Sequence, residues 1–485
     1  MAEAQEQLEV PSGPVEPATS RLGWIGVALF AVAVLFGVHR LSDNSFLTHL
    51  ATGRLILDGK LPHTDPYSFT AAGRPWVVQS WLASVIDAGL ERIAGLGAVR
   101  LFCGLLMGTL VWLIWRLTKP AGDLMARLIT LFLAAGAGVN WWGERPQMIA
   151  FVLLAAALVV VTERRSSWWL APIFLVWVNV HASWPVGLAI VGAYLLSGFV
   201  DDGHRDAGFL GAVVRPCVVA AAGCVVGALV SPYGVDLLTF PLHMAQRTEE
   251  LRLLIEWRAP KIFVIDTMGV AIMAVIGLVG TWRSRRPVAG LLVVVLAAMT
   301  AYSARNIAVG AVALVPVVAR SLNGFGSMGR PVPIGRRAMA ITVVAVLVLA
   351  PVLIGVTGPD LDLTTYPVTL IDRLEAKGWV ARPGIHLVAR DTVGNYLGFR
   401  YGESARVFVD DRAEVYPYRV LRDEVDLTGR TGDWGGILDR YGANIVVWPV
   451  SDHIVRYLDH DPGWRSLGRA DGFGAWCRVS GLDGC

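Results

Sequence analysis

The chain has 485 residues, of which 54% are hydrophobic and 17% are charged, whereas a soluble domain is usually about a quarter charged. Its net charge is only +3 at pH 7, so a nucleic-acid partner has no electrostatic support. The apolar residues come in long runs separated by short basic loops, which excludes an ordinary soluble enzyme, a disordered chain and a disulfide-stabilised scaffold. The composition therefore indicates a polytopic membrane protein.

The apolar runs predict the number of membrane spans. A bilayer core about 30 Å thick is crossed by about 20 apolar residues in a helix, and by somewhat fewer when the helix ends snorkel. We take eleven as the best count, because several runs are short or adjoin one another. The predicted spans lie near residues 23–41, 97–117, 124–140, 147–162, 168–180, 184–200, 211–230, 262–282, 287–303, 305–320 and 338–357.

The basic residues of alternate loops set the orientation, because cytoplasmic loops are enriched in Lys and Arg. One set of loops carries Arg116, Lys119, Arg127, Arg164, Arg165, Arg205, Arg215, Arg283, Arg285, Arg286, Arg330, Arg336 and Arg337. These loops are predicted to be cytoplasmic, together with a disordered N-terminus at residues 1–22. The membrane is predicted to be the plasma membrane. With an odd number of spans, the tail from about Gly358 is predicted to lie on its outer side.

Two loops of the predicted transmembrane domain, residues 23–357, are large enough to form structure on the outer side. In the first, residues 42–96, the spacing predicts a helix from Leu50 to Leu57 with Gly59 as its C-cap. Turns follow from Pro62 to Pro75, and then an interfacial helix from Trp76 to Ile93. In the second loop, residues 231–261, the sequence predicts another interfacial helix followed by an acidic-aromatic turn.

The tail, residues 358–485, differs in composition and predicts a small extracytoplasmic α/β domain. Helices are expected near Ile437–Tyr441 and His453–Asp459. Strands are expected at Ile385–Ala389, Arg406–Val409, Asn444–Val447 and Ala475–Val479. Cys477 and Cys485 both lie in this domain and can pair in an oxidising compartment. The predicted fold class is thus an all-α polytopic membrane domain of about 11 helices followed by this small domain.

Polar groups at the outer ends of the spans are the candidate functional residues, because charged groups beside a bilayer mark function more often than surface charges do. Asp43 and His49 follow the first span, and Asp65 lies in a turn of the first loop. The others are Glu144, Arg145, Gln147, Asn179, His181, Glu256, Arg305 and Asn306. Structural roles are also open, since Asp43 can cap a helix and Asp65 can form an Asx turn.

Taken together, these side chains suit group transfer from a lipid phosphate. A carboxylate can act as general base for a hydroxyl nucleophile. Arginines suit a phosphate or pyrophosphate leaving group, through charge-assisted bidentate hydrogen bonds. No glycine-rich nucleotide loop, P-loop or nucleophile elbow occurs in the tail sequence, where Val409-Asp410-Asp411-Arg412 is either a site or an ordinary strand-end turn.

The order of motifs resembles the GT-C superfamily of integral membrane glycosyltransferases, in particular a poorly characterised bacterial branch. Asp43 and His49 match a D-x-D-x-W-W-H-like motif after the first span. The later matches are Thr64–Ser68, Gly73–Trp76, Trp81–Leu82, Arg145–Gln147, Asn179–His181, Ser231–Gly234, Glu256–Trp257, Ala304–Asn306 and Asp411–Tyr416. The series covers nearly the whole chain, although each motif alone is weak. The chain departs from the first motif at Ser45, Leu47 and Thr48.

The resemblance implies an inverting transferase that uses a polyprenyl-phosphate-linked sugar at the outer face of the bacterial plasma membrane. Asp43 would be the general base, with His49 and Asp65 as further catalytic candidates. The substrate or phosphate would contact Arg145, Gln147, Asn179, His181, Glu256, Arg305 and Asn306. The acceptor would be a cell-envelope glycan or glycolipid.

Ser45 stands where the motif has its second acid, which argues against a metal-binding D-x-D. A divalent cation stays open as a cofactor, with no metal ligand assigned. Two other functions are open at this point. One is a scaffold or assembly protein that keeps the fold without activity, and the other is a transporter of lipid-linked saccharides. A transporter would be expected to show hydropathy repeats and polar groups near mid-span, and the sequence shows neither.

Overall fold

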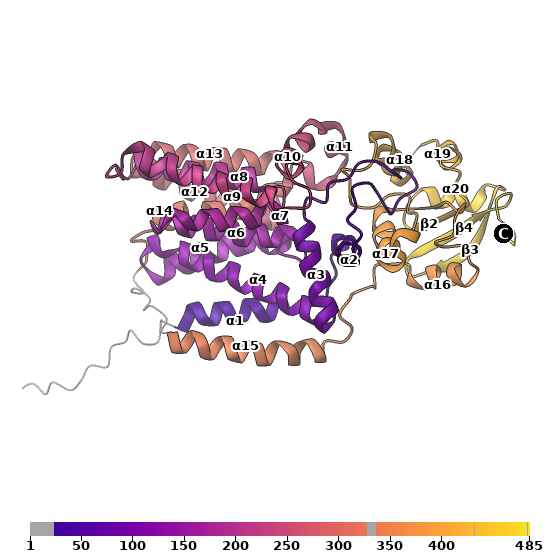
Figure 1. Ribbon diagram of the computed structural model, residues 1–485, viewed down its shortest axis with the longest axis horizontal. Coiled ribbons are helices and arrows are strands. Elements are labelled where there is room, and N and C mark those ends of the chain that lie inside the picture. The colour runs from indigo at the N-terminus through magenta and orange to yellow at the C-terminus, as the bar shows by residue number, and fades with distance from the viewer. Residues whose placement is uncertain (1–23, 327–335, 431, 483) are drawn as a thin grey trace, which may run out of the picture.

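The computed structural model describes residues 24–326, 336–430, 432–482 and 484–485 (Figure 1). The predicted N-terminal segment 1–22 and Arg330 lie outside these residues. The chain forms a helical bundle at one end and a small domain with a sheet at the other, with a layer of short helices between them (Figure 1). We refer to the bundle end beside the small domain as the tail-side end and to the opposite end as the far end.

Each of the eleven predicted spans overlaps one α-helix. They are α1 (Ile25–Gly37), α4 (Leu96–Leu117), α5 (Leu124–Gly138), α6 (Pro146–Thr162), α7 (Leu170–Val180), α8 (Trp184–Val200), α9 (Arg215–Leu229), α12 (Ile265–Arg283), α13 (Pro287–Tyr302), α14 (Ile307–Ser321) and α15 (Arg336–Val356). Among the described residues, six helical segments are long and apolar enough to cross a membrane, and the other five helices are shorter. The chain is therefore built as a membrane protein, while the count of eleven spans stays a prediction.

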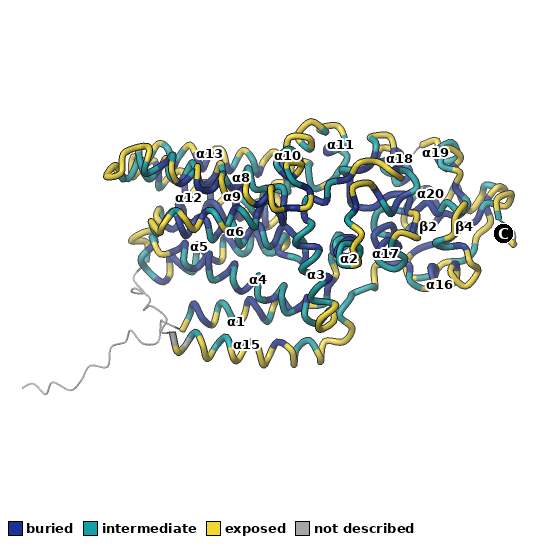
Figure 2. The backbone as a smooth tube through the Cα atoms, in the orientation of Figure 1, coloured by how far each residue is buried: buried dark blue, intermediate teal, exposed yellow. Residues whose placement is uncertain are grey.

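Helix α14 lies inside the bundle and packs against α4, α5, α6, α12 and α13. Its most apolar stretch is 67% buried, against 11% for that of α15, which lies at the edge beside α1 (Figure 2). Helix α1 approaches α4 closely because α4 presents glycines there. A Cβ atom at Gly104 would stand 2.8 Å from the carbonyl oxygen of Val34, which is closer than such atoms come.

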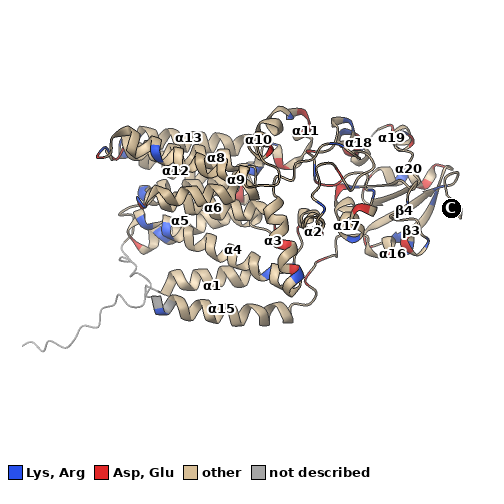
Figure 3. Cartoon of the chain, in the orientation of Figure 1, with Lys and Arg blue, Asp and Glu red and all other residues tan. Residues whose placement is uncertain are grey.

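The loops predicted to share one face do meet at the far end of the bundle, where Figure 3 shows most of the bundle's basic residues. Glu163 accepts hydrogen bonds there from Arg116, Lys119 and Arg165, which come from two of these loops. The tail domain lies at the opposite end of the bundle (Figure 1). This segregation agrees with the predicted alternation of loops, and the cytoplasmic identity of the far end stays a prediction.

Four short helices form the layer at the tail-side end: α2 (Asn44–Leu57), α3 (Trp81–Ala94), α10 (Asp236–Gln246) and α11 (Thr248–Leu253). Helix α2 begins earlier than predicted because Asp43 caps it, its side chain accepting a hydrogen bond from the backbone N–H of Ser45. It ends before Gly59, whose φ of 81° supplies the expected left-handed residue. Helix α3 begins at Trp81, five residues later than predicted, since residues 76–78 have no regular secondary structure and residues 79–80 form a turn.

The tail domain combines a four-stranded sheet with five α-helices. The helices are α16 (Val368–Ala376), α17 (Asp391–Tyr401), α18 (Tyr418–Thr428), α19 (Trp434–Arg440) and α20 (Ile454–His460). The strands β1 (Leu387–Ala389), β2 (Ile445–Pro449), β3 (Trp464–Ala470) and β4 (Phe473–Arg478) lie in the order β1-β2-β4-β3. β1 and β2 are parallel and the other pairs are antiparallel. Cys477 and Cys485 form a disulfide bond, as the sequence allowed.

One predicted strand is not part of this sheet. Residues 406–409 instead make an isolated bridge to the first tail-side loop, residues 42–96. The N–H of Val407 donates to the carbonyl oxygen of Tyr67 at 2.8 Å, and the N–H of Phe69 donates to that of Val407 at 3.1 Å. The apolar alternation that suggested a strand therefore belongs to a contact between two distant segments. Strand β3, most of which is exposed or half-buried, was not predicted.

A buried arginine fixes the tail domain on this loop. Arg412 lies between two carboxylates, with Nη2 2.7 Å from Asp65 Oδ1 and 2.6 Å from Asp410 Oδ2. Its guanidinium also lies 4.7 Å and 4.5 Å from the ring centroids of Tyr67 and Trp76. These five residues, which we call the Arg412 cluster, are all buried. Because a buried charge needs a partner, the cluster holds the two segments in one arrangement.

We expect Arg412→Gln to destabilise the full chain by about 3–5 kcal/mol, because the substitution leaves two buried carboxylates without their cation. Thermal unfolding of the purified protein in detergent measures the loss. The matched control is Arg422→Gln, which breaks an exposed pair with Asp426 and should leave the stability close to that of the wild type. Equal stability of the two variants would show that the cluster does not hold the tail domain.

Candidate functional site

Four of the predicted site residues form one continuous chain of ion pairs at the tail-side end. Arg145 Nε lies 2.6 Å from Asp43 Oδ2, and its Nη1 lies 2.5 Å from Glu256 Oε1. Arg305 Nη1 lies 3.5 Å from the other oxygen of Glu256. We call these residues the Arg145 ion-pair chain. Positive and negative groups alternate along it, although more than 250 residues separate its ends in sequence.

Each member lies at the start of a helix or in a short turn, which fixes its backbone. Asp43 precedes α2, and Arg145 precedes α6, whose first residue is a proline suited to that position. Glu256 lies in the 3-10 turn η6 (Ile255–Trp257), and Arg305 in the 3-10 turn η7 (Ala304–Asn306). Ser303 joins the last two by donating a hydrogen bond to the carbonyl oxygen of Glu256 at 3.1 Å.

Glu144, next to Arg145, positions Asp43 through the backbone. Its Oε1 accepts the N–H groups of Ser42 and Asp43, at 2.5 and 3.1 Å. This carboxylate therefore satisfies donors at the start of α2 that the helix itself leaves free. Glu144 is buried, so its role in the site is to hold Asp43 rather than to contact solvent.

The charged groups of the Arg145 ion-pair chain stabilise one another. Burial acts to raise the pKa of Glu256, but Arg145 and Arg305 outweigh it and hold that pKa below its usual value. Burial acts to lower the pKa of Arg145, while Asp43 and Glu256 raise it overall. Both groups are therefore ionised at neutral pH, and an anionic ligand would have to compete with Glu256 for the guanidiniums.

Two imidazoles, the half-buried His49 and the buried His181, lie close to these ion pairs. Burial, and then the charge of Arg145, lower the pKa of His49 to about 4. Burial, and then Arg305 and His49, lower the pKa of His181 to about 3. The Nδ1 atom of His49 lies 3.2 Å from the hydroxyl oxygen of Ser84 on α3. Both rings are therefore neutral at physiological pH and can hydrogen-bond a substrate without adding charge.

The other predicted site residues make structural contacts. Asp65 lies in the Arg412 cluster, where it also accepts hydrogen bonds from the Tyr67 and Ser68 N–H groups, the Asx turn considered above. Asn179 accepts from Trp81 Nε1 at 2.9 Å and joins α3 to α7. The amide of Asn306 donates to a carbonyl at the end of α13, and Gln147 is buried in the first turn of α6. Their roles toward a substrate stay predictions.

Asp411 of the tail domain is a further candidate, to which the sequence assigned no role in the site. It is hydrogen-bonded to Ser45 in the first turn of α2, and the charges of Arg145 and Arg305 act on it. Burial, and then the neighbouring Asp410, raise its pKa to about 7. The sequence analysis singled out the run Asp410-Asp411-Arg412 as a site or a turn. Only the fold places Asp411 beside Ser45, which occupies the position of the second acid in the first motif.

Two more carboxyls lie near the site, the half-buried Glu414 and the buried Asp87. Glu414 accepts a hydrogen bond from Trp76 Nε1 at 3.1 Å, and its charge acts on Arg305. Burial, and then Glu144, raise the pKa of Asp87 on α3 to about 8. Asp87 is therefore neutral at physiological pH. Neither residue carried a signal in the sequence, since each becomes distinctive only through its neighbours in the fold.

The described part of the chain contains no group of three or more His, Cys, Asp and Glu side chains that could hold a metal ion. The carboxylates of the Arg145 ion-pair chain are instead bound to arginines. Carboxylates neutralised in this way do not fit a divalent cation.

Comparison with known proteins identifies no family. No family model and no curated protein matches the chain. Among solved structures, it overlaps a crystal structure of the Archaeoglobus fulgidus oligosaccharyltransferase in complex with Zn and sulfate. That overlap has a TM-score of 0.48 and 10% sequence identity, and covers 93% of this chain and 73% of the other. A TM-score below 0.5 does not establish a shared fold, so the function must be inferred from the residues.

The raised pKa of Asp411 predicts a distinctive dependence of stability on pH. A carboxyl whose folded pKa is raised contributes stability below its unfolded pKa of about 4, and this is lost as the pH rises through about 7. At pH 8 the wild type therefore carries a half-buried charge, close to Asp410, that Asp411→Asn removes. We expect this variant to be more stable than the wild type by on the order of 1–3 kcal/mol at pH 8, with the difference fading toward pH 4.

Thermal unfolding of the full chain between pH 4.5 and 8.5 measures this difference. The control is Asp236→Asn, because Asp236 is exposed on α10 at the same end of the bundle. It should change stability equally at every pH. If Asp411→Asn is less stable than the wild type at pH 8, the environment assigned to Asp411 is wrong.

Proposed function

We propose that the chain is a GT-C-type membrane glycosyltransferase that moves a sugar from a polyprenyl-phosphate donor to an acceptor hydroxyl at the outer face of the plasma membrane. The observation that carries the proposal is the Arg145 ion-pair chain, in which two carboxylates alternate with two arginines at the tail-side end of an apolar bundle. Such a site can bind a phosphate and accept a proton in the same place.

The arginines supply the donor site. The phosphate of the donor is a diester with one negative charge and gains a second charge as its bond to the sugar breaks, and it forms charge-assisted, bidentate hydrogen bonds with guanidinium groups. It would therefore compete with Glu256 for Arg145 and Arg305. The donor would enter sideways from the membrane, its polyprenyl chain remaining among the apolar helices and its phosphate at their ends.

Donor binding would also activate Asp43. In the free protein both of its oxygens have partners, because Oδ1 accepts from the N–H of Ser45 and Oδ2 from Arg145. When the phosphate takes over Arg145, Oδ2 becomes free to accept a proton. The base would thus become available only when the leaving group is in place, which limits wasteful reaction.

The chemical step is a single displacement. Asp43 accepts the proton of the acceptor hydroxyl, and the oxygen attacks the anomeric carbon of the sugar. The bond from that carbon to the phosphate oxygen breaks, and its electron pair leaves with the polyprenyl phosphate, held by Arg145 and Arg305. Attack from the opposite side inverts the anomeric centre. His49 and His181, being neutral, would position the sugar.

The tail domain would close the site on the acceptor side. It brings Asp411 to Ser45 and Glu414 within electrostatic range of Arg305. A carboxyl with a pKa near 7 can hold or release a proton at physiological pH, so Asp411 would assist in removing the acceptor proton. The acceptor class we propose is a cell-envelope glycan or glycolipid.

An inactive scaffold is the second candidate, favoured by one observation. Asp43 is fully explained as a helix cap and ion-pair partner, with no oxygen left over in the free protein. Ser45 also replaces the second acid of the family motif. If donor phosphate does not release Asp43, these contacts serve structure alone.

Asp43→Asn separates the two candidates, because asparagine caps a helix as well as aspartate does but cannot act as a base. We expect the variant to accumulate normally and to lose product formation by about 10²–10⁴-fold. The measurement is the glycolipid profile of a deletion strain that expresses the wild type or the variant.

The matched control is Asp236→Asn, the same substitution at an exposed site, which should restore the wild-type profile. Wild-type glycan output from Asp43→Asn at normal protein level would reject the assignment of Asp43 as base. A deletion strain with no altered glycolipid would reject the enzyme proposal in favour of the scaffold.

A further inference from the structure

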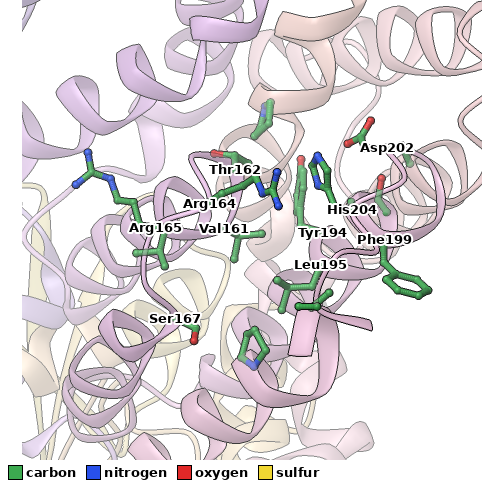
Figure 4. A pocket seen from close by; sticks show the side chains of 18 of the residues that line it. Val161, Thr162, Arg164, Arg165, Ser167, Tyr194, Leu195, Phe199, Asp202 and His204 are labelled. Atoms are coloured by element: carbon green, nitrogen blue, oxygen red, sulfur yellow. The ribbon is translucent and has the colours of Figure 1, made fainter. Parts of the chain in front are cut away.

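A second candidate site lies at the far end of the bundle, away from the Arg145 ion-pair chain. A cavity of about 310 Å³ opens there between α6, α8, α9, α13 and α14. Figure 4 shows side chains from the loop after α6, from α8 and from the loop that follows α8 around this cavity. Its volume is at the lower end of the range for small-ligand sites, about 300–1,000 Å³.

The wall of the cavity carries an excess of positive charge. Four arginines line it, Arg164, Arg165, Arg286 and Arg320, against the carboxylates of Asp202 and Asp206. Asp202 binds both Arg286 Nη2 and Arg320 Nη1, at 2.7 and 2.8 Å, so one carboxylate is shared by two guanidiniums. Asp206 is mostly exposed and lies 3.9 Å from Arg164. The charges present therefore leave room for an anion.

A buried donor beside the cavity has no partner in the described part of the chain. Arg286 Nε is enclosed without a hydrogen bond, although its neighbouring nitrogen is bound to Asp202. Buried polar atoms in proteins are nearly always hydrogen-bonded, and an unpaired buried donor can mark a place where a bound ion or ligand supplies the acceptor. Because Arg286 lines the cavity while its Nε is enclosed, a phosphate oxygen would become the acceptor once the guanidinium turns toward the cavity.

The backbone is also irregular at this cavity. The segment η5 (Leu210–Val214), which leads into α9, is a single π-helical turn. Such turns are rare and frequently occur at functional sites. Here the turn places the small residues Gly211 and Ala212 on the cavity wall, which keeps the space open.

Exposed apolar side chains adjoin the cavity on the same elements. Phe209 and Leu210 are 47% and 72% exposed at the start of η5, and Val200 at the end of α8 is 41% exposed. In a membrane-spanning bundle these side chains contact acyl chains rather than water. The cationic cavity therefore lies next to an apolar surface that suits hydrocarbon chains.

We propose that this cavity binds the phosphate headgroup of an anionic phospholipid from the leaflet at the far end of the bundle. The phosphate accepts hydrogen bonds from Arg286 and Arg164, and the acyl chains lie along Val200, Phe209 and Leu210. Basic pockets between membrane helices bind anionic headgroups through these interactions. The site does not depend on the proposed transferase activity.

The test is native mass spectrometry of the full chain in detergent, titrated separately with phosphatidylglycerol, phosphatidylcholine and inorganic phosphate. We expect one phosphatidylglycerol to be retained, with affinity roughly tenfold weaker in Arg164→Gln and in Arg286→Gln, because each loses a charge-assisted hydrogen bond. The control is Arg283→Gln, an exposed arginine at the same end that does not line the cavity. It should bind as the wild type does.

Several results would overturn the proposal. Equal retention of phosphatidylcholine would show that the cavity does not select the anionic lipid, and inorganic phosphate bound as tightly as the lipid would show a free-anion site. Equal weakening by Arg283→Gln would show a diffuse charge effect. Arg164→Gln changes a side chain that is 60% exposed, so it keeps the test decisive if Arg286→Gln does not fold.

Discussion

The shared guanidinium of Arg145 is the contact on which the tail-side end depends. It joins the start of α2, the start of α6 and the η6 turn through Asp43 and Glu256. Because the site lies at the ends of apolar helices, each of these charges would be costly without its partners. The arrangement is therefore stable as it stands, and in the proposed function a donor phosphate would take the place of a carboxylate on these guanidiniums. That exchange connects the structure of the site with the proposed binding of a donor phosphate.

The tail domain completes this end of the molecule. Arg412 anchors the domain through buried charges and aromatic rings, and the same loop carries Asp411 to the start of α2. The Arg412 cluster and the Arg145 ion-pair chain thus have different roles. Arg412 fixes where the tail domain lies, and Arg145 and Arg305 provide the charge that a phosphate would meet. A carboxyl with a raised pKa between them is a feature that folding stability alone would not favour.

The sequence predicted those parts of the structure that depend on local pattern. Apolar runs located the eleven bundle helices, and the polar groups at their ends located Asp43, Arg145, Glu256 and Arg305, which do converge. It did not predict features that arise from distant segments. Residues 406–409 alternate like a strand but pair with the first tail-side loop, and Asp65 of that loop pairs with Arg412 of the tail domain. The meeting of Asp411 and Ser45 likewise has no local signature.

The most direct test of this account is an experimental structure of the full chain with polyprenyl phosphate bound. The account predicts the phosphate within hydrogen-bonding distance of both Arg145 and Arg305, with the contact between Arg145 and Asp43 broken. A phosphate bound away from these arginines, or bound to them while Asp43 keeps its ion pair, would contradict the proposed donor site and the proposed release of the base.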